Sequence, residues 1–152
     1  MTDITGMNTY EPDPLKKGES NKGWFIRLKE AEKVVARPTV FNRILYFTTH
    51  IPEEGEDEEK RCPGRGTARL YIVEFLSGGG AVFFSEAHYL ANTPSTRSID
   101  IGEGVPSAPL ISADTKGRAS LIVSTSSEQI YSRVILSEGG NKDILYWREV
   151  HP

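Results

Sequence analysis

An acidic run is the part of the sequence best suited to attract a cation. Six carboxylates fall within seven consecutive positions, namely Glu53, Glu54, Glu56, Asp57, Glu58 and Glu59. A calcium loop supplies about six to eight oxygens from alternating positions around a fixed glycine, whereas these acids lie side by side with Gly55 third in the run. The pattern is typical of a solvated loop, with weak cation association as the alternative. No metal site is predicted from it.

The other reactive side chains do not form a catalytic grouping in the sequence. His50, His88 and His151 are far apart, and none has a second ligand at zinc spacing, so each is expected to be a surface or strand-end histidine. The serines around positions 124–127 lack a Gly-x-Ser-x-Gly elbow. Gly78-Gly79-Gly80 lacks the Lys-Ser/Thr of a phosphate loop and is expected to be a turn. We therefore predict no catalytic residue, no cofactor and no enzymatic activity.

Cys62 is the single cysteine, so no disulfide can form within the chain. It lies in a loop-like stretch with Pro63 and Gly64 between Arg61 and Arg65. The favoured interpretation is an unpaired loop thiol without a role. The alternative is a cysteine whose partner belongs to another chain or to a part of the protein missing from this sequence.

The composition is that of an ordinary globular protein. The 152 residues are 38% hydrophobic and 26% charged, with a formal net charge of −3, which argues against extensive disorder and against nucleic-acid binding. The apolar runs are far shorter than the roughly 20 residues that a membrane-spanning helix needs. Residues 1–20 contain Pro12 and Pro14 and no apolar block, so no signal peptide is predicted.

Strand patterns dominate, and the clearest one is a hairpin. Residues 34–41 alternate with a period of two, as in a strand with one buried face. Asn42-Arg43 separates this run from the apolar run Ile44-Leu45-Tyr46-Phe47, and Asn tolerates the positive φ of a two-residue hairpin turn. Before the hairpin, residues 23–28 predict a short strand with Trp24, Ile26 and Leu28 on one face.

Further strands follow the hairpin. Residues 51–66 are expected to be a long inserted loop, residues 68–75 a strand, and residues 81–84 a fourth strand after the glycine turn. Together these segments describe a β-meander of four short antiparallel strands.

The second half of the chain repeats this order of segments. Ser98-Ile99-Asp100-Ile101 is similar to Phe25-Ile26-Arg27-Leu28, and Leu121-Ile122-Val123 is similar to Leu45-Tyr46-Phe47. Asp114-Thr115-Lys116-Gly117 supplies a turn in which Gly117 suits a left-handed position. Residues 144–150 end the chain as one more strand, which could close the unit by pairing with an N-terminal strand. Duplicated four-stranded units are typical of propeller blades.

The sequence therefore predicts an all-β fold with about two antiparallel four-stranded propeller-type blades in an incomplete ring. Residues 1–22 form an extended lead-in with Tyr10 and Leu15 as its only large docking groups, residues 23–97 the first blade with the inserted loop 51–66, and residues 98–152 the second blade and closing strand. Propellers close with about four to eight blades. Either the missing blades belong to another polypeptide, or the two sheets pack together, and the open edges could also support self-association.

The order and spacing of several segments resemble the C-terminal propeller of PilY-type proteins, the type IV pilus tip adhesins and biogenesis factors with quinoprotein-like blades. The segments that carry the resemblance are Gly23-Trp24, Glu32-Lys33-Val34-Val35 with Pro38, Tyr46-Phe47-Thr48-Thr49, the Cys62 loop leading through Gly66-Thr67 to Leu70-Tyr71, Gly104-Val105-Pro106-Ser107-Ala108-Pro109, and Leu145-Tyr146-Trp147-Arg148-Glu149. Longer members of the family carry a calcium loop of the Asp-x-Asp-x-Asn kind and an N-terminal adhesive domain, and this sequence contains neither.

The resemblance implies a non-enzymatic module of type IV pilus biogenesis or adhesion that acts by protein–protein contact, at the cell surface or in the periplasm. Its partners would be pilus proteins or further blades on another chain. The alternatives are a remnant of a quinoprotein-dehydrogenase-like enzyme and a free-standing β-domain that binds a ligand or polysaccharide.

Two sets of residues follow from this interpretation. The expected partner-contact loop comprises Glu53, Glu54, Glu56, Asp57, Glu58, Glu59, Arg61 and Arg65. The expected structural anchors are Trp24, Pro38, Tyr46, Tyr71, Pro109, Tyr131 and Trp147.

Overall fold

The computed structural model describes residues 1–7, 23–53, 65–81 and 97–136, and all regular structure within these ranges is β. The strands are β1 (Thr2–Asp3), β2 (Trp24–Phe25), β3 (Lys33–Val34), β4 (Thr39–Phe41), β5 (Ile44–Pro52), β6 (Gly66–Glu74), β7 (Ser98–Glu103), β8 (Leu110–Ala113), β9 (Ala119–Ser124) and β10 (Ile130–Leu136). The prediction of an all-β protein with antiparallel sheets is confirmed, apart from one short parallel pair of β1 and β2.

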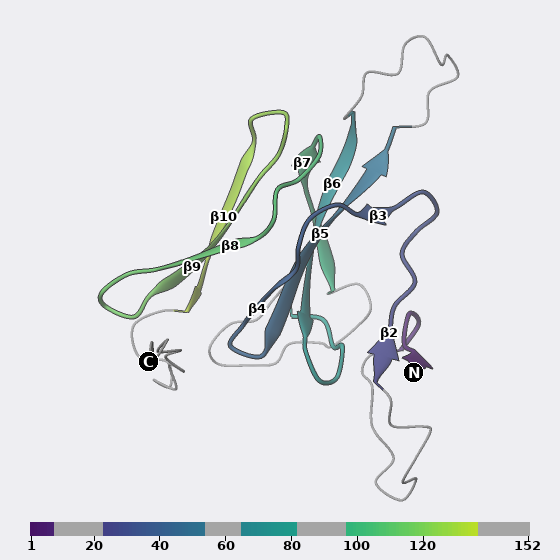
Figure 1. Cartoon of the computed structure of the whole chain (residues 1–152), viewed down its shortest axis with the longest axis horizontal. Helices are drawn as coiled ribbons and strands as arrows, with labels where there is room; N and C mark the ends of the chain where they lie inside the picture. Colours follow the sequence, from purple (N-terminus) through teal and green to yellow (C-terminus); the bar gives the residue numbers. More distant parts are fainter. Residues whose placement is uncertain (8–22, 54–64, 82–96, 137–152) are drawn as a thin grey trace, which may run out of the picture.

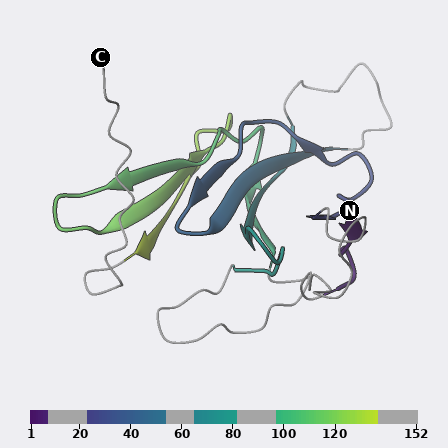
Figure 2. The same ribbon diagram turned by 60° about the horizontal axis from the view of Figure 1, so that its bottom comes forward.

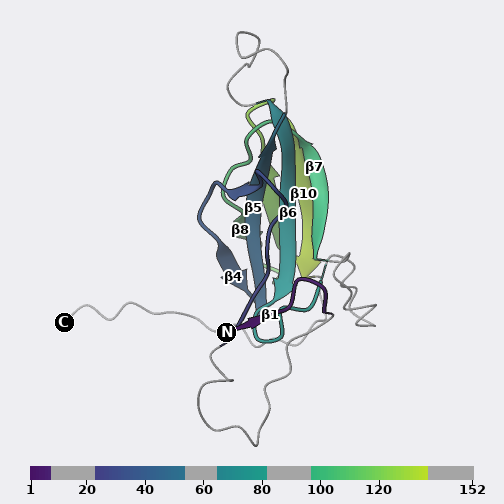
Figure 3. The same ribbon diagram turned by 90° about the vertical axis from the view of Figure 1, so that its right-hand side faces the viewer.

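Two antiparallel sheets make up most of the fold. The larger has five strands in the order β3-β5-β6-β7, with β4 also paired to β5, and the smaller has the order β10-β9-β8. Figure 1 shows the two sheets beside each other, and Figure 3 looks onto the larger sheet with strands of the smaller one behind it. The described strands do not close into a ring, and neither described sheet has the four strands expected of a blade.

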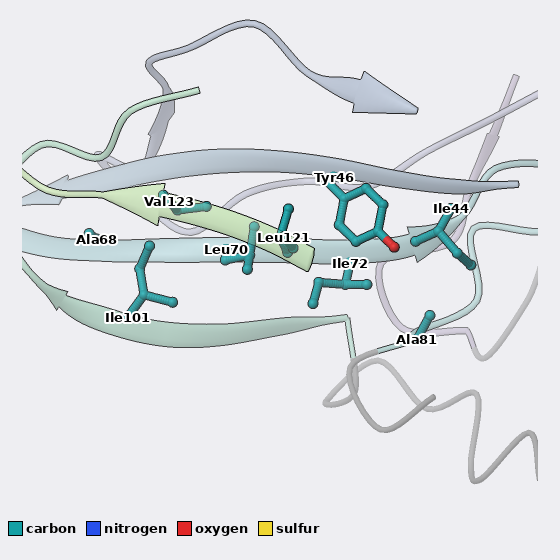
Figure 4. Close-up of a cluster of buried hydrophobic side chains, with 9 residues drawn as sticks. All are labelled: Ile44, Tyr46, Ala68, Leu70, Ile72, Ala81, Ile101, Leu121 and Val123. Carbon is teal, nitrogen blue, oxygen red and sulfur yellow. The ribbon is translucent and has the colours of Figure 1, made fainter. Parts of the chain in front are cut away.

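One apolar core joins the two sheets. Alternate residues of β5 and β6, including Tyr46, Leu70 and Ile72, face Leu121 and Val123 from β9. Figure 4 shows these side chains lying between the strands. Leu70, Leu121 and Val123 are completely buried, so the sheets stabilise each other through a shared interior, as in a β-sandwich.

The opposite face of the larger sheet is covered by the segment that follows Gly23. Trp24, Ile26 and Leu28 pack against a second buried cluster that includes Phe47 and Tyr71. These three side chains share one face as expected, although only Trp24–Phe25 is a strand. Figure 2 shows β2 and the N-terminus on the side of the larger sheet away from β8–β10.

The predicted hairpin at Asn42-Arg43 is confirmed. Phe41 pairs with Ile44, and both turn residues have positive φ, 47° at Asn42 and 64° at Arg43. The two strands are therefore joined by the tight turn that matches their twist.

The segment before this turn differs from the prediction. Residues 34–41 are not one strand with a buried face, because they divide into β3 and β4, and Val34 and Val40 are more than half exposed. Pro38, which cannot donate a backbone hydrogen bond, lies in the interruption and is exposed. Both short strands instead pair with different parts of β5.

β7 also differs from the prediction. Residues 98–101 were expected to begin the second unit, but β7 pairs with β6 in the larger sheet, with Leu70 opposite Ile99. The alternation of side chains in this segment predicts a strand, but it does not predict which strand it pairs with. The predicted turn at Asp114-Thr115-Lys116-Gly117 is present, with Gly117 at a φ of 81°. The predicted strands at residues 82–84 and 144–150 lie outside the described residues.

The N-terminal residues are docked to the body of the protein. Ile4 is completely buried, although the sequence reasoning gave docking roles only to Tyr10 and Leu15. Its backbone N–H donates to the carbonyl of Phe25 over 3.0 Å. Tyr10 and Leu15 lie outside the described residues, and β1 pairs with β2.

Candidate functional site

Three connections from both sheets gather at one end of the sandwich, which we call the loop end. They are the connection from β5 to β6, whose flanks Pro52 and Gly66 are paired, the connection from β7 to β8 beginning at Glu103, and the turn from Thr125 to Gln129 between β9 and β10. The described residues of these connections lie together in the upper part of Figure 1.

Hydrogen bonds link these connections directly. The N–H of Gly104 donates to the carbonyl of Gly66 over 2.9 Å, and the N–H of Ser126 donates to the carbonyl of Val105 over 2.9 Å. In return, the Ser126 hydroxyl accepts the N–H of Val105 over 2.9 Å. Because each bond joins residues far apart in the sequence, the loop end is fixed as one surface.

The Glu103 backbone adds two further links. Its N–H donates to Oε1 of Gln129 over 3.0 Å, and its carbonyl accepts the hydroxyl of Ser127 over 2.5 Å. The larger sheet is thereby connected to the turn of the smaller sheet through both backbone polar groups of one residue, Glu103.

Gly104 is required by this arrangement. Its φ of 93° lies in the region that favours glycine, and an added Cβ would come within 2.6 Å of the Ser126 hydroxyl oxygen. A larger residue at this position would push the two connections apart.

His50 lies directly beneath the loop end. It is buried, with 8% of its surface exposed, and no hydrogen-bond partner among the described residues reaches its Nε2. A Cβ at Gly66 would come within 2.7 Å of that nitrogen. His50 was expected to be a surface or strand-end histidine. It lies two residues from the end of β5 but is not on the surface, because it continues the inward-facing alternation of β5 that includes Tyr46 and Thr48.

Part of the expected contact loop lies in the described residues. Glu53 and Arg65 are both exposed at its base, where the N–H of Glu53 donates to the carbonyl of Arg65 over 3.3 Å. The other expected contact residues, Glu54, Glu56, Asp57, Glu58, Glu59 and Arg61, lie outside the described residues, as do Cys62, His88 and His151. Two further exposed carboxylates, Glu103 and Glu128, occur on the neighbouring connections.

The expected anchors occupy different positions. Tyr46 is buried in the shared core, and Tyr131 packs against that core from β10. Pro109 is buried, and its carbonyl accepts the Thr39 hydroxyl over 2.8 Å, which links β4 to the start of β8. Trp24 packs on the other face of the larger sheet, and its Nε1 donates to the carbonyl of Phe75 over 3.1 Å. Trp147 lies outside the described residues.

The sequence reasoning missed a buried carboxylate on that other face. Oε1 of Glu32 accepts the hydroxyl of Thr49 over 2.6 Å and that of Tyr71 over 3.1 Å, while Oε2 accepts the N–H of Lys29 over 3.0 Å. Burial, together with the negative charge of Glu32, raises the pKa of Tyr71 to about 12. These hydroxyls fix the carboxylate of Glu32 and hold β3 against β5.

The role of Arg97 was also missed. This residue is 3% exposed, and its guanidinium donates to the carbonyls of Gly78, Ile4 and Met7 over 2.7, 2.9 and 2.5 Å. Burial lowers the pKa of Arg97. Arg97 therefore ties the N-terminal residues to the turn that follows β6, at the end opposite the loop end.

The described residues contain no group of three or more His, Cys, Asp and Glu side chains that could hold a metal ion. Within the same ranges there is no helix long and apolar enough to cross a membrane.

Comparison of the chain with protein-family models, with curated proteins and with solved structures finds no match. The choice of the loop end as the candidate site therefore depends on its geometry alone.

Proposed function

We propose that this chain is a non-enzymatic protein–protein contact module and that the loop end is its partner-binding surface. The observation that carries the proposal is the hydrogen bonding between the connections, above all from Gly104 to Gly66 and from Ser126 to Val105. A surface that is ordered before binding loses little conformational entropy when a partner docks. Loops held on a rigid scaffold are the usual location of recognition residues.

The charge of this surface favours a partner with a basic face. Glu53, Glu103 and Glu128 are exposed there. Opposite charge on the partner would speed association and disfavour acidic competitors.

A role in type IV pilus biogenesis or adhesion is the specific form of this proposal, and it rests on the segments that resemble PilY-type propellers. In this form the chain derives from a propeller, and its two sheets correspond to neighbouring blades. Their packing through one shared core is compatible with that origin. The partner would then be a pilin-like subunit.

The test is the affinity of the full chain for a purified type IV pilin subunit, measured by titration calorimetry at two salt concentrations. The double variant Glu103→Gln with Glu128→Gln removes two negative charges from the loop end. Ser112→Lys with Thr115→Lys is the matched control, because it changes the net charge equally but near the β8–β9 turn at the opposite end.

We expect binding that weakens with salt, and a loss of about tenfold in affinity for the loop-end variant with little change for the control. Absence of pilin binding would contradict the proposed role in type IV pilus biogenesis or adhesion. Equal loss in both variants would show a general charge effect and would contradict the loop end as the contact surface.

A further inference from the structure

The edge of the smaller sheet at β10 differs from the other sheet edges in the described residues. β10 spans Ile130–Leu136 and contains one charged residue, Arg133, while Ile130 and Val134 are 72% and 61% exposed. By contrast, β8 has four residues and begins beside Pro109, and β7 carries Asp100 and Glu103 and an irregular register against β6. Short length, charge, proline and irregular register all discourage strand addition. Of these three edge strands, β10 is therefore the least protected against pairing.

The hydrogen-bond pattern shows which backbone groups face this open edge. The N–H of Thr125 donates to the carbonyl of Gln129, so these two residues form a hydrogen-bonded pair in the β9–β10 register. Hydrogen-bonded pairs alternate along an antiparallel ladder. The N–H and C=O groups of Ile130, Ser132 and Val134 therefore point away from β9. No described strand pairs with β10 on that side.

The same three residues are self-complementary under a two-fold axis. If Ser132 lies opposite Ser132 of a second copy, Ile130 lies opposite Val134 in both directions, and every outward N–H meets an outward C=O. The apolar pair then covers exposed side chains on the outer face. In this register Arg133 lies opposite Tyr131 rather than another arginine, so no like charges meet. The register shift in β10 falls beyond Val134 and does not interfere.

We propose that β10 is a self-association surface, at which two copies of this chain pair antiparallel with Ser132 at the two-fold axis. The two smaller sheets become one continuous sheet across the dimer. This surface begins directly after Gln129, the last residue of the loop-end turn, and shares no residue with the loop end.

Thiol crosslinking tests the register. A hydrogen-bonded antiparallel pair places its Cα atoms about 5.5 Å apart, but its Cβ atoms are too far apart for an unstrained disulfide, so a short bifunctional maleimide is the suitable reagent. The full chain with Cys62→Ser and Ser132→Cys should form a covalent dimer with this reagent. The control carries Cys62→Ser and Ser112→Cys, because Ser112 is exposed on the other edge strand of the same sheet. It should form little covalent dimer.

Light scattering of the chain without added cysteines tests the association itself. We expect a dimer that dissociates on dilution, with a Kd on the order of ten micromolar for such a small interface. Val134→Lys should weaken it by at least about tenfold, since a charge would lie opposite Ile130. Leu110→Lys is the matched control, because Leu110 is 60% exposed on the β8 edge, and it should leave the Kd unchanged. Both sites are exposed, so neither variant should prevent folding.

Hydrogen exchange of the three outward amides separates the other outcomes. A monomer in which the amides of Ile130, Ser132 and Val134 are protected would show that a segment of the same chain, such as residues 144–150, occupies the edge. A monomer in which these amides exchange freely would show an open edge. Either result, or equal crosslinking at positions 132 and 112, would overturn the proposal.

Discussion

The two faces of the larger sheet are stabilised in different ways. The inner face meets the smaller sheet through side chains such as Leu70 and Ile72, which have no polar atoms to satisfy. The outer face contains the stacked rings of Phe47 and Tyr71, whose centroids are 4.6 Å apart, and hydrogen bonds to the buried carboxylate of Glu32. Apolar packing tolerates small changes of geometry. By contrast, the fold loses stability when a buried carboxylate loses a single hydrogen-bond partner. The comparison teaches that the facing sheets are held together mainly by apolar burial, with hydrogen bonds at the loop end, and that β3 is positioned by hydrogen bonds.

The largest expected effect is on the inner face. Leu70→Ala would leave a cavity at a completely buried position between the sheets, and it should lower the free energy of unfolding by about 2–5 kcal/mol. Urea denaturation followed by circular dichroism measures the change. A loss below about 1 kcal/mol would mean that the two sheets do not share this core.

Glu32→Ala should have a smaller but clear effect on the outer face. It removes the carboxylate that accepts hydrogen bonds from the hydroxyls of Thr49 and Tyr71. The loss of this acceptor for two buried donors should lower the free energy of unfolding by about 1–3 kcal/mol. Tyr71→Phe is the matched control, because it removes one donor and keeps the stacked ring, and it should cost about half as much. Equal costs would show that the carboxylate itself contributes little.

High pH should affect both faces through their tyrosines. Burial raises the pKa of Tyr46, against the opposing positive charge of Arg133, and the pKa of Tyr71, each to about 12. Because the unfolded phenols ionise near pH 10, this contribution is fully present below about pH 10 and is lost as the pH rises toward about 12. At pH 11 the loss should be on the order of 1 kcal/mol for each residue.

Spectrophotometric titration of tyrosinate sharpens the comparison of the two faces. Glu32→Gln removes the negative charge beside Tyr71 and should lower the pKa of Tyr71 toward its ordinary value. The pKa of Tyr46, on the inner face, should not change. A parallel shift of both tyrosines would contradict the separation of the faces.

The smallest effect is expected at the β4–β5 turn, which positions neither face. Arg43→Gly would relieve a positive φ of 64° but remove the 3.2 Å ion pair with Glu74. Glycine is favoured at this turn position, and an ion pair whose arginine is mostly exposed to solvent contributes about 0–1 kcal/mol. Thermal unfolding should therefore show a free-energy change within about 1 kcal/mol of zero, and a larger destabilisation would show that the ion pair holds the turn.

The sequence could predict features that depend on neighbouring residues. The hairpin at Asn42 follows from turn chemistry, and the long strands β5 and β6 follow from apolar runs that suit a sheet covered on both faces. The pairing of β7 with β6 could not be predicted, because strand partners are chosen by contacts distant in the sequence.

The candidate site was less predictable than the fold. Glu32, Arg97 and His50 belong to residue types that are mostly exposed or intermediate in burial, and their partners come from other segments. The predicted inserted loop of residues 51–66 falls between β5 and β6, but Ile51, Pro52 and Gly66 belong to these strands, and residues 54–64 lie outside the described residues. The linkage of that connection to Gly104 depends on the assembled sandwich. The alternation that places His50 with Tyr46 was a usable signal for its burial.

Native-state hydrogen exchange tests the central claim most directly, because the loop end is one surface only if the two sheets form one cooperative unit. The amides of β6 and β9 that bond to neighbouring strands should open with the same free energy as global unfolding measured in urea. Markedly weaker protection of β9 than of β6 would show that the smaller sheet opens independently. That result would contradict a shared core and, with it, a fixed contact surface made from both sheets.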